Sequence, residues 1–148
     1  MKVLYASNIC SEKEFQKIYN KCSSIKPLQS IQKFNKLLGK GLTKQKNVKL
    51  EIITSAPVNR KMCKQVFWWG HKEIEESIEY HYCFMINIPI IKFITLFFSA
   101  LCISLKWCLK NKNEKDVCVI YDAYCPIIAN VTAIMARIFN IKVIALYT

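Results

Sequence analysis

The segment "DVCVIYDAYCPIIANVTAIMARIFNIKVIALY" (116–147) decides the expected fold. It opens with a continuous apolar run at 116–122, continues with apolar residues at helical spacing over 125–140, and closes with a second apolar run at 141–147. Continuous apolar runs are typical of strands buried on both faces, and a helix between two of them indicates parallel strands in one sheet. We therefore expect a strand–helix–strand unit, with Asn140 as the left-handed cap that ends the helix.

The rest of the chain extends this alternation. Three more apolar segments predict strands, at 2–7, 47–57 and 79–89. Two segments predict helices, at 27–42 and 88–115, the first with Pro27 in its first turn and Gly39 or Gly41 at its exit. Residues 8–26 lack a clear period, so they predict a long loop with at most one helical turn, around 12–19. Residues 57–78 predict a loop with a short helix.

This order of elements predicts an α/β fold in a single domain, 1–148. The expected architecture is a Rossmann-like, doubly wound parallel sheet of about five strands in the order 3-2-1-4-5, with helices on both faces. The switch point of such a sheet lies between strands one and four. Ligands bind there, outside the carboxyl ends of the strands.

Composition limits the classes of partner. The chain has 22 basic and 10 acidic residues, a net charge of +12, which favours an anionic partner or reflects a solvated lysine-rich surface. Arg60 and Arg137 are the only arginines. Proteins that read bases use the arginine fork heavily, so we expect no nucleic-acid partner.

The cysteines indicate a reducing compartment. Eight are present without a CxxC pair, and the N-terminal apolar stretch is too short for a secretory signal. We expect reduced thiols in a cytoplasmic protein, buried as small apolar side chains, with Cys102 and Cys118 as examples. No spacing of cysteine and histidine matches a metal-ligand pattern, so we expect no metal.

The segment 88–115 allows two interpretations. Thirteen residues without charge separate Lys92 from Lys106, fewer than the roughly 20 apolar residues that cross a bilayer. One interpretation is a crossover helix packed on the sheet. The other is a helix at a membrane surface, because Trp107 and the flanking lysines are typical of membrane interfaces.

The loops at the switch point supply the candidate site. Asp122 follows strand four and either caps the next helix or serves as a base or sugar-binding carboxylate. Five more residues are candidates for ligand binding: Ser7, Asn8, Asn59, Arg60 and Tyr124. Each also has an ordinary structural explanation, as a strand end, a solvated surface group or a half-buried tyrosine. The sequence contains no GxGxxG, GxxxxGK[ST] or GxSxG motif, so we expect no bound nucleotide cofactor.

Several segments together resemble a known family. The opening "MKVLYAS", the helix "QSIQKFNKLLGKGL", the strand end "IITSAPVNR" and the segment at 116–148 are similar to the N-terminal half of bacterial family 4 glycosyltransferases, which have the GT-B fold of two facing Rossmann-like domains. Many members carry a histidine after the fourth strand, where this chain reads "YDAYCP". The role of that histidine therefore does not carry over to Tyr124 or Asp122.

The resemblance implies a function. The chain would be the acceptor-binding half of an enzyme that transfers a sugar from a nucleotide-sugar to a cell-surface polysaccharide or lipid-linked acceptor. The donor would bind through a C-terminal domain that this chain lacks, so the chain alone would be inactive. A peripheral location on the inner face of the cell membrane would fit such acceptors. The alternative is a non-catalytic, basic module that binds an anionic membrane surface.

Overall fold

The computed structural model describes residues 1–23, 25–45 and 47–147, and it is an α/β protein with a six-stranded central sheet. The strands of this sheet, in spatial order, are β4 (His71–Glu75), β5 (Ile78–Tyr82), β2 (Lys49–Thr54), β1 (Lys2–Ala6), β7 (Val117–Asp122) and β8 (Lys142–Leu146). Every pair is parallel except β4 with β5. The predicted fold class is therefore confirmed.

The strand order differs from the five-stranded expectation at one edge. The parallel strands β5, β2, β1, β7 and β8 are neighbours as expected, but β4 adds an antiparallel strand beyond β5. Residues 76 and 77, between β4 and β5, both have positive φ, 49° and 67°. Such a two-residue hairpin turn usually contains glycine or asparagine, whereas this chain has Glu76 and Ser77. The prediction of a loop with a short helix at 57–78 was wrong for this reason.

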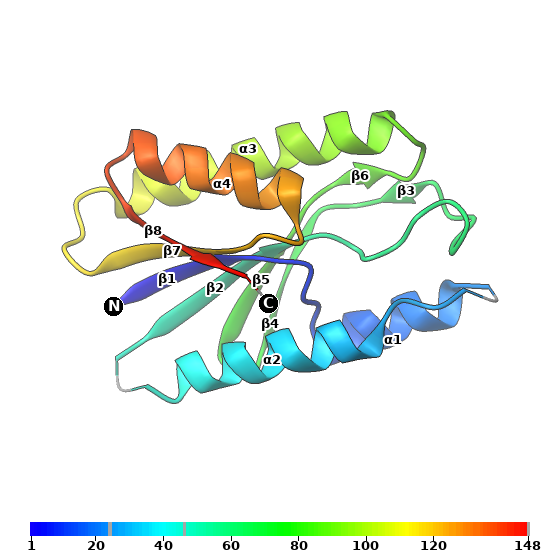
Figure 1. Ribbon diagram of the computed structural model, residues 1–148, viewed down its shortest axis with the longest axis horizontal. Coiled ribbons are helices and arrows are strands. Elements are labelled where there is room, and N and C mark those ends of the chain that lie inside the picture. The colour runs from blue at the N-terminus through cyan, green and yellow to red at the C-terminus, as the bar shows by residue number, and fades with distance from the viewer. Residues whose placement is uncertain (24, 46, 148) are drawn as a thin grey trace.

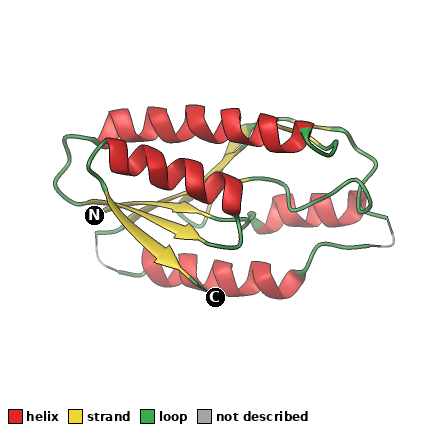
Figure 2. Cartoon of the chain, turned by 45° about the horizontal axis from the view of Figure 1, so that its top comes forward, coloured by secondary structure: helices red, strands yellow, loops and turns green. Residues whose placement is uncertain are grey.

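In the described part of the chain, four helices cover the sheet in two layers (Figure 1). Helices α1 (Glu12–Lys21) and α2 (Gln29–Thr43) lie on one face, and α3 (Ile91–Asn111) and α4 (Pro126–Ile138) lie on the other. Figure 2 shows the same two helical layers from a tilted view. The Ser104 and Thr132 hydroxyls, 2.9 Å apart and buried, join α3 to α4.

Helix α1 replaces the predicted long loop at 8–26. Ser11 is its N-cap, and its Oγ accepts a hydrogen bond from the Glu14 backbone N–H at 3.1 Å. The sequence carries this signal, because Ser11 and Glu14 form the S-x-x-E pattern of a capping box. Phe15 and Ile18, three residues apart, are buried against the core. The polar outer face of the helix obscured this short apolar stripe.

The small second sheet pairs β3 (Phe67–Trp68) with β6 (Met85–Ile86), antiparallel and beside α3. The predicted strand at 79–89 is thus two strands, β5 and β6, separated by residues 83 and 84. The Phe84 N–H donates to Ser99 Oγ at 2.9 Å, and the Ile86 N–H donates to Thr95 Oγ1 at 3.1 Å. The hydroxyls of Ser99 and Thr95 on α3 thus accept backbone hydrogen bonds that a neighbouring strand would otherwise accept.

Two predicted details of α2 were wrong, and one of α4 was right. Pro27 precedes α2 rather than lying in its first turn, and Gly39 and Gly41 lie inside it. Asn140 has φ 55°, as predicted for a left-handed cap. The Ile141 N–H reaches the Ala136 carbonyl at 2.8 Å, and the Asn140 N–H reaches the Arg137 carbonyl at 3.0 Å, the bonding of a Schellman motif.

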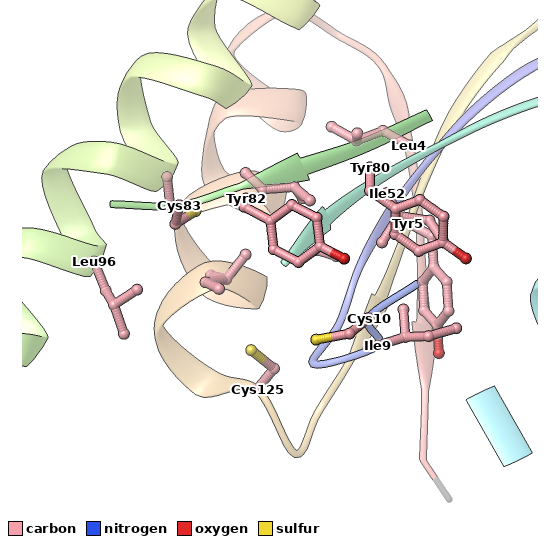
Figure 3. Packing of buried hydrophobic residues seen from close by; sticks show 14 of the residues in the cluster. Leu4, Tyr5, Ile9, Cys10, Ile52, Tyr80, Tyr82, Cys83, Leu96 and Cys125 are labelled. Atoms are coloured by element: carbon pink, nitrogen blue, oxygen red, sulfur yellow. The ribbon is translucent and has the colours of Figure 1, made fainter. Parts of the chain in front are cut away.

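The core lies on both sides of the sheet and includes most of the thiols. Tyr80, Ile52 and Tyr5 are register partners on β5, β2 and β1, and Figure 3 shows them close together. All eight cysteines are free, and all but one are buried. The exception is Cys102, which is exposed on α3, so its predicted burial was wrong.

We predict that replacing Asn140 by valine lowers the free energy of unfolding by about 1–2 kcal/mol, because a left-handed conformation is costly for a residue with a branched Cβ. Asn140→Gly should be close to neutral. Asn130→Val is the matched control, because Asn130 is exposed in the right-handed part of α4. Urea unfolding followed by circular dichroism measures the difference, and equal stability of the two valine variants would contradict the prediction.

Candidate functional site

A pocket of about 330 Å³ lies at the carboxyl edge of the sheet, where β1, β2 and β7 end. Its walls come from the loops after these strands and from the first turns of α3 and α4. The predicted meeting of the loops after strands one and four is therefore confirmed.

The pocket contains three of the six predicted site residues. Asn8 follows β1, Asn59 follows β2 and Tyr124 follows β7, and all three line the pocket. The Tyr124 side chain is 69% exposed, so it is available to a ligand. Segments far apart in the sequence thus bring two amides and one phenol to a single opening.

Ser7 and Arg60 do not line the pocket. Ser7 is fully buried, and its Oγ accepts the Ile9 N–H at 3.2 Å, which shapes the turn after β1. The Arg60 guanidinium is exposed and donates to the Lys64 carbonyl within its own loop. Both side chains serve the structure of the loops that carry Asn8 and Asn59.

Asp122 is buried on the α2 side of the sheet and does not line the pocket. Its Oδ1 accepts the Tyr124 N–H at 2.9 Å, and its Oδ2 accepts Asn35 Nδ2 at 3.3 Å. Asn35 Oδ1 in turn accepts the Tyr5 hydroxyl at 3.0 Å. Burial raises the pKa of the Tyr5 phenol above its ordinary value, so Tyr5 remains a neutral donor.

This arrangement differs from both roles that the sequence suggests for Asp122. The N-cap of α4 is Cys125, so Asp122 forms the turn before the helix rather than capping the helix itself. Since its carboxylate faces Asn35 and the Tyr124 backbone, we infer that Asp122 positions Tyr124 and does not touch a ligand. Its neighbour on α2, Asn35, was not foreseen, because only the packing of α2 brings the two together.

Two hydrogen bonds join the walls of the pocket. The Cys125 thiol donates to Asn8 Oδ1 at 3.0 Å and links the loops after β7 and β1. Figure 3 shows Cys125 in the turn that leads into α4. Burial raises the pKa of this thiol to about 12, so it stays protonated as a donor. Lys92 Nζ donates to the Val58 carbonyl at 2.5 Å and links α3 to the loop after β2.

Lys92 lines the pocket but was not among the predicted site residues. The sequence presents it as a lysine flanking an apolar helix, yet the structure places it, half-buried, in the pocket wall. The predicted helix begins at residue 88, whereas α3 begins at Ile91, so the structure places Lys92 in the first turn. Cations are disfavoured at helix N-termini, so a lysine there indicates a role other than helix stability.

A second cluster of ionisable groups lies under α3, away from the pocket. His81 Nε2 is 3.0 Å from Glu51 Oε2 and 3.4 Å from Glu79 Oε1, spacings that would suit a metal ion. Lys72 Nζ, however, is 3.0 Å from Glu79, and Lys49 Nζ is 3.8 Å from Glu51. The carboxylates are therefore already compensated by cations, and we interpret the cluster as an ion-pair network.

Comparison with protein-family models, curated proteins and solved structures finds no match for this chain. Its function is therefore inferred from the pocket and the residues around it.

We predict that Asp122→Ala lowers the free energy of unfolding by about 1–3 kcal/mol, because it leaves the Asn35 amide and the Tyr124 N–H without a buried acceptor. Asp116→Ala is the matched control, since Asp116 is exposed just before β7. Urea denaturation gives the stability, and the amide resonance of Tyr124 reports the turn. If both alanine variants are equally stable, the proposed positioning role is wrong.

Proposed function

We propose that this chain is the acceptor-binding half of a glycosyltransferase, which transfers a sugar from a nucleotide-sugar to a cell-surface polysaccharide or lipid-linked acceptor. The supporting observation is the pocket formed by the loops after β1, β2 and β7. Open α/β sheets bind ligands at such a crevice, where neighbouring strands send their chains to opposite faces. The acceptor would bind in this pocket.

The chemistry of the pocket suits a saccharide. The Nδ2 groups of Asn8 and Asn59 offer donors to sugar hydroxyls. Their Oδ1 atoms already accept hydrogen bonds within the protein, from the Cys125 thiol at Asn8 and from the Lys61 and Met62 N–H groups at Asn59. The ring of Tyr124 offers an apolar face with a polar tip. The loops that form the pocket carry no glycine-rich motif for a nucleotide phosphate, so the nucleotide-sugar would bind to a partner domain.

We predict that Tyr124→Ala weakens saccharide binding about 5- to 30-fold, because the variant loses apolar contact area and one hydrogen bond. The probes are a panel of neutral oligosaccharides and a water-soluble, short-chain prenyl diphosphate-linked sugar. Two-dimensional NMR of the labelled chain follows the amides of Asn8, Asn59 and Tyr124 during each titration.

Tyr147→Ala is the matched control, because Tyr147 is also exposed, near the end of β8, but does not line the pocket. The control should bind like the unaltered chain. The proposal is wrong if no saccharide shifts the pocket amides while a nucleotide-sugar does, since the pocket would then be a donor site.

A second candidate function is binding to an anionic membrane surface, and the exposed face of α3 favours it. Of the helices described, α3 alone is long and apolar enough to cross a bilayer by length and composition, but its other side packs on α4 and the sheet. Seven large apolar side chains on it are 36–59% exposed: Ile91, Phe93, Ile94, Phe97, Phe98, Leu105 and Leu109. Lys106, Lys110 and Lys112 follow near its C-terminal end. Each lysine adds about 1 kcal/mol near an anionic surface.

We predict that the chain floats with vesicles that contain anionic lipid and less with neutral vesicles, because the lysines add to apolar insertion. Phe98→Glu should reduce flotation at least fivefold, since it places a negative charge in the apolar face. Leu37→Glu is the matched control, because Leu37 is also exposed, 69% against 59% for Phe98, and lies on α2, across the sheet. No flotation, or an equal loss in both variants, would remove this candidate.

A further inference from the structure

The starting observation is the environment of the Lys92 ammonium group. The side chain is half-buried in the pocket wall, and its Nζ is held by the Val58 carbonyl at 2.5 Å. Among the described residues no carboxylate lies within 4.0 Å of Nζ. The neutral carbonyl of Val58 leaves the charge of the lysine uncompensated.

The surroundings add positive rather than negative potential. Lys92 lies in the first turn of α3, and neither α3 nor α4 has an acidic residue in its first turn. The pocket lies between these two helix N-termini, which carry partial positive charge. In α3 the first N–H groups already donate to the carbonyls of residues 88–90, so the charge there comes from the helix dipole and Lys92. Burial lowers the pKa of Lys92, because the charged form is poorly solvated there.

Such a lysine reduces the stability of the free protein, since it is desolvated, unpaired and at the wrong end of a helix. An anion in the pocket would supply the missing counter-charge and so offset these costs. A phosphate oxygen could accept from Lys92 Nζ. Pro126 begins α4 and has no N–H, so the N–H of Ile127, which lines the pocket, would be the first backbone donor of this helix. Tyr124 and Asn8, which also line the pocket, would contact the group bonded to the phosphate.

We propose that this pocket recognises a phosphate or diphosphate group on its ligand, with Lys92 as the main contact. The inference rests on the proposed function and deepens it: the acceptor would be a phosphate-linked saccharide rather than a neutral polysaccharide. The phosphate could belong to a lipid-linked sugar or to a free phosphate compound, and the two sources share the same recognition chemistry.

The test titrates the labelled chain with inorganic diphosphate, with a short-chain prenyl diphosphate-linked sugar and with neutral oligosaccharides. We expect saturable shifts of the Asn8 and Tyr124 amides with both diphosphates. Lys92→Met keeps the length of the side chain but removes its charge, and it should bind diphosphate about 10- to 100-fold more weakly. Lys92→Arg should retain most of the affinity.

Lys112→Met, an exposed site just beyond the other end of α3, controls for loss of general positive charge and should bind like the unaltered chain. The melting temperature of each variant shows whether it is folded. The pKa of Lys92, measured from its Cε resonance, should rise when diphosphate binds. Absence of saturable binding, or equal loss in Lys92→Met and Lys112→Met, would overturn the inference.

The outcomes separate this inference from the proposed function. If neutral oligosaccharides bind equally well to Lys92→Met and to the unaltered chain, the pocket is a saccharide site without phosphate recognition, and only the present inference fails. If diphosphate binds through Lys92 but no saccharide adds affinity, the anion site stands and the glycosyltransferase proposal fails. Tighter binding of the prenyl-linked sugar than of inorganic diphosphate would identify the lipid-linked source.

Discussion

The parallel pairing of β1 with β7 is the constraint on which the site depends. These two strands are adjacent and in register, from Lys2 opposite Val117 to Ala6 opposite Tyr121. The chain that leaves β1 turns to α1 on one face, and the chain that leaves β7 turns to α4 on the other (Figure 1). Two loops that diverge from adjacent strand ends leave a gap between them, and the pocket forms there.

The alternation of side chains along β7 explains why Asp122 has a structural role while Tyr124 is available to a ligand. Ile120 and Asp122 share one face of the strand, so the Asp122 carboxylate meets Asn35 of α2 beneath the sheet. Tyr124 lies beyond the strand and turns toward the opposite layer, where it lines the pocket. The buried carboxylate holds the Tyr124 backbone in place, and this division explains how a residue without access to a ligand can still determine the geometry of the site.

Helix α3 connects the two surfaces for which we propose binding. Its first turn supplies Lys92 to the pocket, and Phe93, the next residue, lines the pocket and is 58% exposed. From there the exposed apolar face continues along the helix to Leu109. A lipid-linked ligand with its phosphate at Lys92 would find an apolar path along α3. The basic composition of the chain is thus consistent with both an anionic ligand and an anionic surface.

The amino-acid sequence predicted the elements with a strong apolar pattern, the parallel sheet and the edge of the sheet where Asn8, Asn59 and Tyr124 meet. These features are predictable because continuous apolar runs indicate buried strands, apolar residues at a spacing of 3.6 indicate helices, and parallel connections place the loops at one edge. The sequence did not predict helix α1, because its polar outer face obscures the short apolar stripe. It did not predict the β4–β5 hairpin, because the turn has Glu76 and Ser77 in place of glycine or asparagine. Tertiary packing alone pairs Asp122 with Asn35 and brings Lys92 into the pocket, where no carboxylate of the described residues lies within 4.0 Å of its Nζ. These are contacts between residues 34 and 87 positions apart in the chain, and only packing determines them.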